Sequence, residues 1–249
     1  MNKGLKVAIG AAVAAAAGAA YHFFFRPWHA SWGSTPDERD RKMPLDELVE
    51  RPNVITNRAV TINAPADQIW PWLVQMGELP RGGFYTYSWI ERLLGMRTAN
   101  ATAILNEFQN LKPGDHLDRD GNLVVKALVP SRFIVLGPPA GTPSGDATWA
   151  IELVPADEKS TRLVSRVRAR IAPNVHGAFW FALLDPGQFI MERKWLLGVK
   201  ARAEGRIRSE GEAMLDELVQ PVQEKLEPAE APSEVPAEAK AEYEEPVEV

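Results

Sequence analysis

Glu192 is the residue of this sequence whose type and surroundings most suggest chemistry. It shares helical spacing with Phe189 and Leu196, so a carboxylate falls on the apolar side of a predicted helix over residues 185–204. A carboxylate buried among apolar side chains must be paired or hydrogen-bonded. Two interpretations stay open: a structural ion pair with a sheet arginine such as Arg132, or a polar anchor or acid/base group with a raised pKa in an apolar pocket.

Aromatic residues form the second group with chemical potential. Phe84, Tyr85, Tyr87 and Trp89 place four aromatic side chains within six residues. Such side chains either belong to the core or line the rim of a pocket, where an apolar body and a polar tip are both useful. On the second interpretation, the predicted ligand-binding residues are Tyr85, Tyr87, Trp89, Trp149, Phe189, Glu192 and Trp195.

Several classes of function lack their usual sequence patterns. The chain has no cysteine, and it contains no nucleophile elbow, no zinc-protease helix motif, no phosphate loop and no dinucleotide fingerprint. Its four histidines are not spaced as metal ligands. We therefore predict no catalytic residue set, no metal and no cofactor.

The net charge of −5 is unevenly distributed along the chain. Nine glutamates and only two lysines lie within residues 221–249, together with several prolines. This segment cannot bury enough apolar surface to offset its ordering entropy, so residues 220–249 are predicted to be a disordered acidic tail. The rest of the chain is close to neutral and has no dense basic face, so we expect no nucleic-acid partner.

The N-terminal segment is apolar over residues 7–25, apart from His22. A helix over residues 5–25 would be about 30 Å long, which matches the hydrocarbon thickness of a bilayer. Aromatic and basic residues at 21–28 resemble an interfacial collar. We therefore predict a single-pass N-terminal membrane anchor over residues 1–28, on an undetermined side of the membrane. The alternative is export after signal-peptide cleavage near Ala17-Gly18-Ala19.

The remaining periodicities predict the elements that must position these residues. Alternating apolar residues indicate strands, spacings of three and four indicate helices, and glycine or proline separates them. The predicted strands are 54–62, 123–129, 132–136, 147–154 and 161–171, and the predicted helices are 66–76, 88–94 and 185–204. A run of antiparallel strands followed by a long apolar helix indicates an α+β fold.

Two local patterns refine this prediction. Thr35 and Glu38, and likewise Ser88 and Glu91, have the spacing of helix capping boxes. Four arginines alternate along one face of the last strand. A solvated face is favoured for them over an anion-binding site. These are Arg162, Arg166, Arg168 and Arg170.

The chain resembles the START-like, Bet v 1-like superfamily, also called SRPBCC, which includes polyketide cyclase/dehydrase and lipid-transport proteins. Residues 60–77, 82–95, 111–115 and 185–204 carry the resemblance, which is to a bacterial branch whose members mostly lack an assigned function. It implies a helix-grip fold, in which a curved antiparallel sheet wraps around a long C-terminal helix and encloses an apolar cavity. One such fold hosts many functions, so it does not define the chemistry.

Together these observations predict five regions and one principal function. The regions are an anchor at 1–28, a connector at 29–53, a helix-grip domain at 54–205, a helical extension at 206–219 and the tail at 220–249. The predicted function is a membrane-tethered binding domain for an apolar small molecule or lipid. The alternatives are a cyclase- or dehydratase-like enzyme, with Glu192 and Tyr85 or Tyr87 as acid/base groups, and a scaffold that recruits a partner through its tail. The oligomeric state is left open.

Overall fold

The computed structural model describes residues 3–139, 147–171, 174 and 185–207. Contacts divide the chain into residues 1–207 and 208–249, and all described residues lie in the first unit. The predicted acidic tail and nearly all of the predicted helical extension therefore lie outside the described residues.

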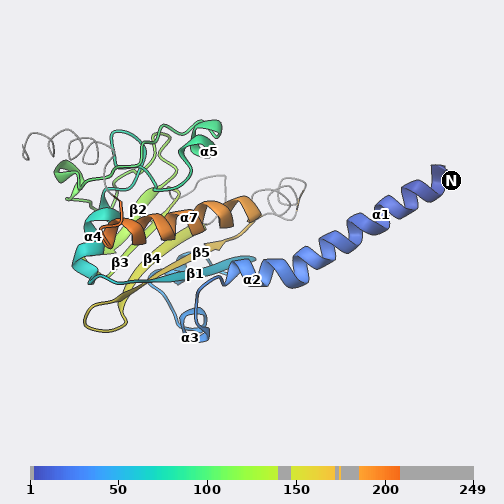
Figure 1. Cartoon of the computed structure of the whole chain (residues 1–249), viewed down its shortest axis with the longest axis horizontal. Coiled ribbons are helices and arrows are strands. Elements are labelled where there is room, and N and C mark those ends of the chain that lie inside the picture. Colours follow the sequence, from blue (N-terminus) through green and yellow to red (C-terminus); the bar gives the residue numbers. More distant parts are fainter. Residues whose placement is uncertain (1–2, 140–146, 172–173, 175–184, 208–249) are drawn as a thin grey trace, which may run out of the picture. The chain divides into compact units, whose positions relative to one another are not determined.

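Five antiparallel strands form one curved sheet, drawn in Figure 1. Their spatial order is β1-β5-β4-β3-β2, so the first strand pairs with the last. The strands are β1 (Val54–Ile62), β2 (Val124–Val129), β3 (Phe133–Gly137), β4 (Ala147–Pro155) and β5 (Thr161–Ala169). The sheet and the helix that follows it confirm the predicted α+β class.

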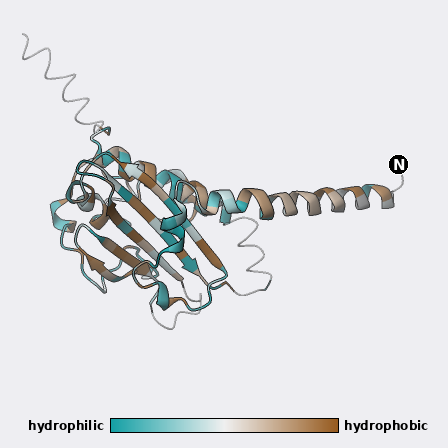
Figure 2. Cartoon of the chain, turned by 90° about the horizontal axis from the view of Figure 1, so that it is seen from below, coloured by the Kyte–Doolittle hydropathy of each residue, from teal (hydrophilic) through white to brown (hydrophobic). Residues whose placement is uncertain are grey.

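The sheet is buried on both faces. Successive side chains of a strand point to opposite faces, and brown and teal bands alternate along the strands in Figure 2. Ile151 and Leu163 pack on the face that contacts the C-terminal helix, whereas Ala150 and Val164 pack with Met43 on the outer face. The strand alternation therefore supplies two separate apolar clusters.

Helix α7 (Asp185–Ala203) lies across the inner face of the sheet (Figure 1). It contacts β1 and helix α4 (Ala66–Val74), and its Leu196 and Val199 are fully buried in the main core. Gly198 allows the closest approach, because a Cβ there would lie 2.5 Å from the carbonyl oxygen of Tyr85. The predicted long helix is thus the element on which the inner core is built.

The connector covers the outer face of the sheet. It contains α3 (Pro36–Asp40) and the 3-10 turn η2 (Asp46–Leu48). The capping box is confirmed, since the Glu38 amide donates to Thr35 Oγ1 at 3.2 Å and the Thr35 amide donates to Glu38 Oε2 at 2.8 Å.

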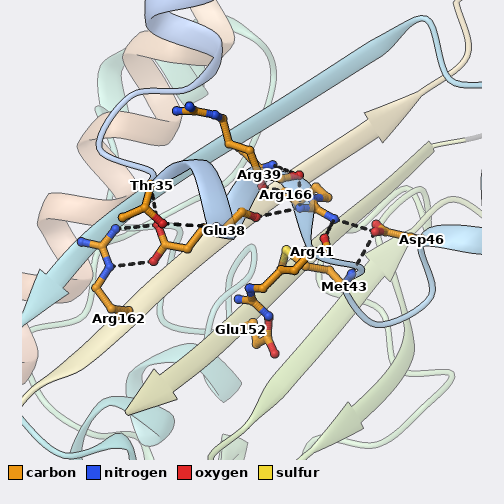
Figure 3. A network of polar contacts seen from close by, with 10 residues as sticks. Thr35, Glu38, Arg39, Arg41, Met43, Asp46, Glu152, Arg162 and Arg166 are labelled. Atoms are coloured by element: carbon orange, nitrogen blue, oxygen red, sulfur yellow. Dashed lines mark hydrogen bonds and ion pairs between the residues drawn. The ribbon is translucent and has the colours of Figure 1, made fainter. Parts of the chain in front are cut away.

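The arginine row of β5 binds this connector, as Figure 3 shows. Arg166 is almost fully buried and donates to Asp46 Oδ2 at 2.6 Å and to the carbonyl oxygens of Glu38, Arg39 and Arg41. Arg162 forms a forked pair with both carboxylate oxygens of Glu38, at 2.8 Å each. The prediction of a solvated arginine face was therefore wrong for these two residues, because the connector covers that face.

Helix α5 (Ser88–Leu93) corrects the second capping prediction. Its N-cap is Tyr87, and no side chain caps it. Glu91 instead accepts hydrogen bonds from the hydroxyls of Thr86 and Thr98. The Ser88 and Glu91 spacing did not predict this, because two threonines outside the motif bind the carboxylate. The 3-10 turn η3 (Asn106–Phe108) follows in the same long connection.

The N-terminal segment also differs from the prediction. It is divided into α1 (Lys3–Ala20), the π-helical segment η1 (Tyr21–Phe25) and α2 (Arg26–Ala30). Among the described residues, no helix combines the length and the apolar character needed to cross a membrane. The prediction of a single-pass anchor that crosses the membrane with residues 5–25 was therefore wrong. Figure 2 shows the physical reason: α1 is mostly pale brown, since alanine and glycine dominate it and are only weakly apolar.

The aromatic and basic residues interpreted as an interfacial collar include contacts with the folded domain. Tyr21 donates to Asp185 Oδ2 at 2.8 Å, and Arg26 Nε donates to the same oxygen at 3.1 Å. His29, the residue that follows that collar, is fully buried. These three side chains are therefore explained by the start of α7.

Candidate functional site

A cavity of about 700 Å³ lies between α7, α5 and strands β3, β4 and β5. Most of its lining is apolar. The apolar lining residues are Phe84, Met96, Leu123, Leu136, Pro138, Ala147, Trp149, Val167, Met191 and Trp195. The polar side chains that join them are Thr86, Glu91, Asn122, Thr148, Gln188 and Glu192.

Glu192 lines this cavity with 7% of its surface exposed, and both carboxylate oxygens are engaged. Oε2 accepts from the guanidinium of Arg58, and Oε1 accepts from Ser165 Oγ at 2.7 Å. The partner is thus an arginine of β1 and not Arg132, which we had predicted. Arg58 lies on the inner face of β1, opposite α7, and this position explains the pairing.

Ser165 joins the ion pair to the aromatic wall of the cavity. Its hydroxyl accepts from Trp149 Nε1 at 2.8 Å while it donates to Glu192. The ring of Trp149 meets that of Trp195 edge-on, with centroids 4.9 Å apart and planes at 73°. Trp195 Nε1 in turn lies 2.9 Å from the sulfur of Met76. Both indole N–H groups are therefore satisfied within the protein.

A chain of buried polar groups extends from the ion pair to the N-terminal segment. Arg58 Nε donates to the carbonyl oxygen of His29 at 2.8 Å, and the His29 ring lies 3.1 Å from the Tyr21 hydroxyl. Burial lowers the pKa of His29, an effect that the nearby Asp185 opposes and Arg58 reinforces. Burial and the hydrogen bond to Asp185 raise the pKa of Tyr21. This segment and the cavity therefore share one hydrogen-bonded network.

Glu91 is the second carboxylate of the cavity, and only 1% of its surface is exposed. Its hydrogen-bond partners are the hydroxyls of Thr86 and Thr98. Within the part of the chain that the structure describes, no lysine, arginine or histidine pairs with it. The cavity thus contains one carboxylate with a cationic partner and one without.

Three of the seven predicted ligand-binding residues line the cavity together: Trp149, Glu192 and Trp195. They come from β4 and α7, two elements that face one another in the helix-grip arrangement that the resemblance implied. A role in binding stays a prediction for all three.

The other four lie elsewhere. Tyr85 is buried behind the cavity, where its hydroxyl donates to the carbonyl oxygen of Trp72 at 2.8 Å, and burial raises its pKa. Tyr87 and Trp89 are 36% and 63% exposed. Phe189 packs against Trp28, His29 and Trp32, outside the cavity lining. None of the four is among the residues that line the cavity.

Sequence reasoning also missed Arg58, Glu91 and Gln188. The alternation of β1 placed Arg58 among apolar neighbours, and this was a usable signal for a buried arginine with a partner. Gln188 precedes Glu192 by four residues, and this spacing, which places both on one helix face, was a signal that could have indicated it. Glu91 gave no such signal, because the capping motif offered a competing explanation for its position.

No protein-family model matches this sequence, and no curated protein matches it. Among solved structures, the chain is similar to Zhui, an aromatase/cyclase from Streptomyces sp. R1128, with 17% identity and a TM-score of 0.35; the match covers 64% of this chain and 98% of that one. A protein from Thermobifida fusca has 16% identity and a TM-score of 0.39, with 60% of this chain and 95% of that one covered. A protein from Nitrosomonas europaea has 11% identity and a TM-score of 0.39, with 64% and 98% covered.

The architecture itself matches the resemblance found in the sequence. A curved antiparallel sheet holds a long C-terminal helix, and a mostly apolar pocket lies between them. The START-like, Bet v 1-like resemblance is therefore confirmed at the level of the fold.

Proposed function

We propose that this chain binds an apolar small molecule in the cavity beneath α7. The observation that supports this most is the cavity itself, because about 700 Å³ of mostly apolar lining is within the range of small-molecule sites. The pocket opens to solvent, so a ligand could enter it. A lipid chain or a fused-ring molecule has the matching surface.

The state of Glu192 favours binding over proton transfer. A general acid or base must be within hydrogen-bond reach of the proton that it transfers. Here one oxygen is held by Arg58 and the other by Ser165. Tyr85, the other predicted acid/base group, is bonded to a backbone carbonyl outside the cavity. The cyclase- or dehydratase-like alternative is therefore the second candidate, supported only by the place of Glu192 in the cavity wall.

Fluorescence titration with methylpyrene tests the proposal. We expect saturable binding to the full chain, with a blue-shifted and brighter emission. Val167 lies on β5 beside Trp149 and lines the cavity, so Val167→Phe should weaken binding at least about tenfold by filling it. Val129→Phe is the matched control: it makes the same change on an exposed strand end outside the cavity and should leave the affinity unchanged.

Two results would count against this function. One is the absence of saturable binding to the folded wild type. The other is equal weakening by both phenylalanine variants, which would place the probe on the surface. The enzyme alternative makes a different prediction, in which Glu192→Gln abolishes turnover of a substrate while binding and folding persist.

A further inference from the structure

The polar side chains of the cavity wall differ in whether they can donate a hydrogen bond to a bound molecule or accept one from it. Among the described residues that line the cavity, none is lysine, arginine or histidine. The N–H groups of both tryptophans are bonded to Ser165 and Met76. The carboxylates of Glu91 and Glu192 can only accept hydrogen bonds when ionised. The ionised groups of the described wall are therefore acceptors, and its remaining donors are neutral: the amides of Asn122 and Gln188 and the hydroxyl of Thr148.

Glu192 is charge-compensated, whereas Glu91 is not. The buried guanidinium of Arg58 stands directly behind Glu192. Glu91 is buried more completely, and its side-chain contacts among the described residues are two neutral hydroxyls, from Thr86 and Thr98. A carboxylate has about four acceptor positions, so two of those on Glu91 stay open. An uncompensated carboxylate in an apolar cavity is costly unless another donor completes it.

Gln188 adds a second unsatisfied group. Its Oε1 is buried without a hydrogen-bond partner among the described residues, and the residue lines the same cavity. Buried polar atoms are almost always bonded, so an orphan in a cavity wall indicates where a bound molecule makes its polar contact. Gln188 thus indicates that a bound molecule makes a polar contact with the cavity wall. Glu91, an acceptor, indicates that this molecule donates a hydrogen bond.

We propose that the cavity selects an apolar molecule that carries a hydrogen-bond donor, a hydroxyl or an ammonium group, and that Glu91 accepts that bond. The inference rests on the proposed binding function and adds the class of ligand. The inference also excludes molecules that end in a carboxylate. Such a molecule would be repelled by the carboxylates of Glu91 and Glu192, and its binding would be weakened.

Three probes with one pyrene body isolate the polar end: methylpyrene, pyrenylmethanol and pyrenecarboxylate. The full-length wild type should bind the alcohol about tenfold or more tightly than methylpyrene, as expected for a hydrogen bond to a charged acceptor. The carboxylate should bind most weakly. Glu91→Gln keeps the shape and one acceptor but removes the charge, so it should reduce the advantage of the alcohol to about threefold or less. Glu107→Gln, an exposed glutamate of η3 outside the cavity, is the matched control and should keep the wild-type ranking.

The outcomes separate this inference from the proposed function. If methylpyrene binds but the alcohol binds no tighter, or the carboxylate binds best, the donor preference is refuted and the binding function stands. If Glu91→Gln keeps the full preference, the assignment to Glu91 is refuted. If none of the three probes binds, both proposals fail. Should Glu91→Gln not fold, the wild-type ranking of the three probes decides alone.

Discussion

Replacing Glu192 with glutamine should destabilise the protein strongly, by about 3–5 kcal/mol in the free energy of unfolding. The reason lies in Arg58, which is fully buried and takes its anionic contact from Glu192. The glutamine can still accept from Ser165, but it presents a neutral amide to the guanidinium. The remaining bond of Arg58 to the His29 carbonyl leaves the charge uncompensated in the core. Removing one partner of a buried ion pair costs far more than the pair contributes net.

Urea denaturation of the full chain measures this effect. Glu47→Gln breaks an exposed pair with Lys42 and should leave the urea midpoint unchanged, which makes it the matched control. The double variant Arg58→Met with Glu192→Leu removes both charges together and should recover most of the lost stability, since an apolar pair replaces an ion pair at little cost. A loss below about 1 kcal/mol for Glu192→Gln would refute the structural ion pair.

Three further predictions follow from other contacts. The folded state lowers the pKa of His29, so the unfolded chain takes up a proton at this residue at a higher pH than the folded chain. The stabilising contribution of neutral His29 should therefore be complete above pH 6.5 and be lost as the pH falls below it. In urea titrations at several pH values, His29→Gln should flatten this dependence, and a slope equal to that of the wild type would contradict the prediction. Gly198→Ala should cost about 1–3 kcal/mol in thermal unfolding, since its Cβ would meet backbone 2.5 Å away, whereas Gly187→Ala meets nothing within 4 Å and should not destabilise. Arg166→Leu should release the connector and speed thermolysin cleavage within residues 34–49, unlike the change of exposed Arg170 to leucine; equal cleavage would contradict this.

The fold could be predicted from local patterns because its elements obey simple periodicities. Strands such as β4 and β5 alternate apolar residues and end at turn residues, so their bounds were predicted to within about two residues. The outer face was misjudged for a physical reason. A row of arginines along a strand gives the same sequence pattern whether water or another segment covers it. Here the connector covers it, and its carbonyl oxygens accept hydrogen bonds from Arg166.

The site was less predictable, because a cavity depends on which faces meet across long sequence distances. Glu192 was found from its place on an apolar helix face, but its partner Arg58 is 134 residues away. Aromatic density at residues 84–89 gave no means to separate Phe84, which lines the cavity, from Tyr85 behind it. Glu91 was assigned to a local capping motif, whereas tertiary contacts determine its role.

The N-terminal prediction failed because alanine and glycine, which are only weakly apolar, dominate the helix that was expected to span the membrane. Tyr21 and Arg26 looked like part of an interfacial collar, yet both donate hydrogen bonds to Asp185 at the start of α7, and the adjacent His29 is hydrogen-bonded to Tyr21. Their polar groups are thus explained by the domain itself.

An isotope-edited nuclear Overhauser experiment on the methylpyrene complex locates the bound molecule by its neighbours. If the cavity holds the apolar ligand, contacts should appear from the pyrene ring to the methyl groups of Met96, Val167 and Met191. Contacts confined to exposed side chains such as Leu93 and Ile190 would place the ligand on the surface and contradict binding beneath α7.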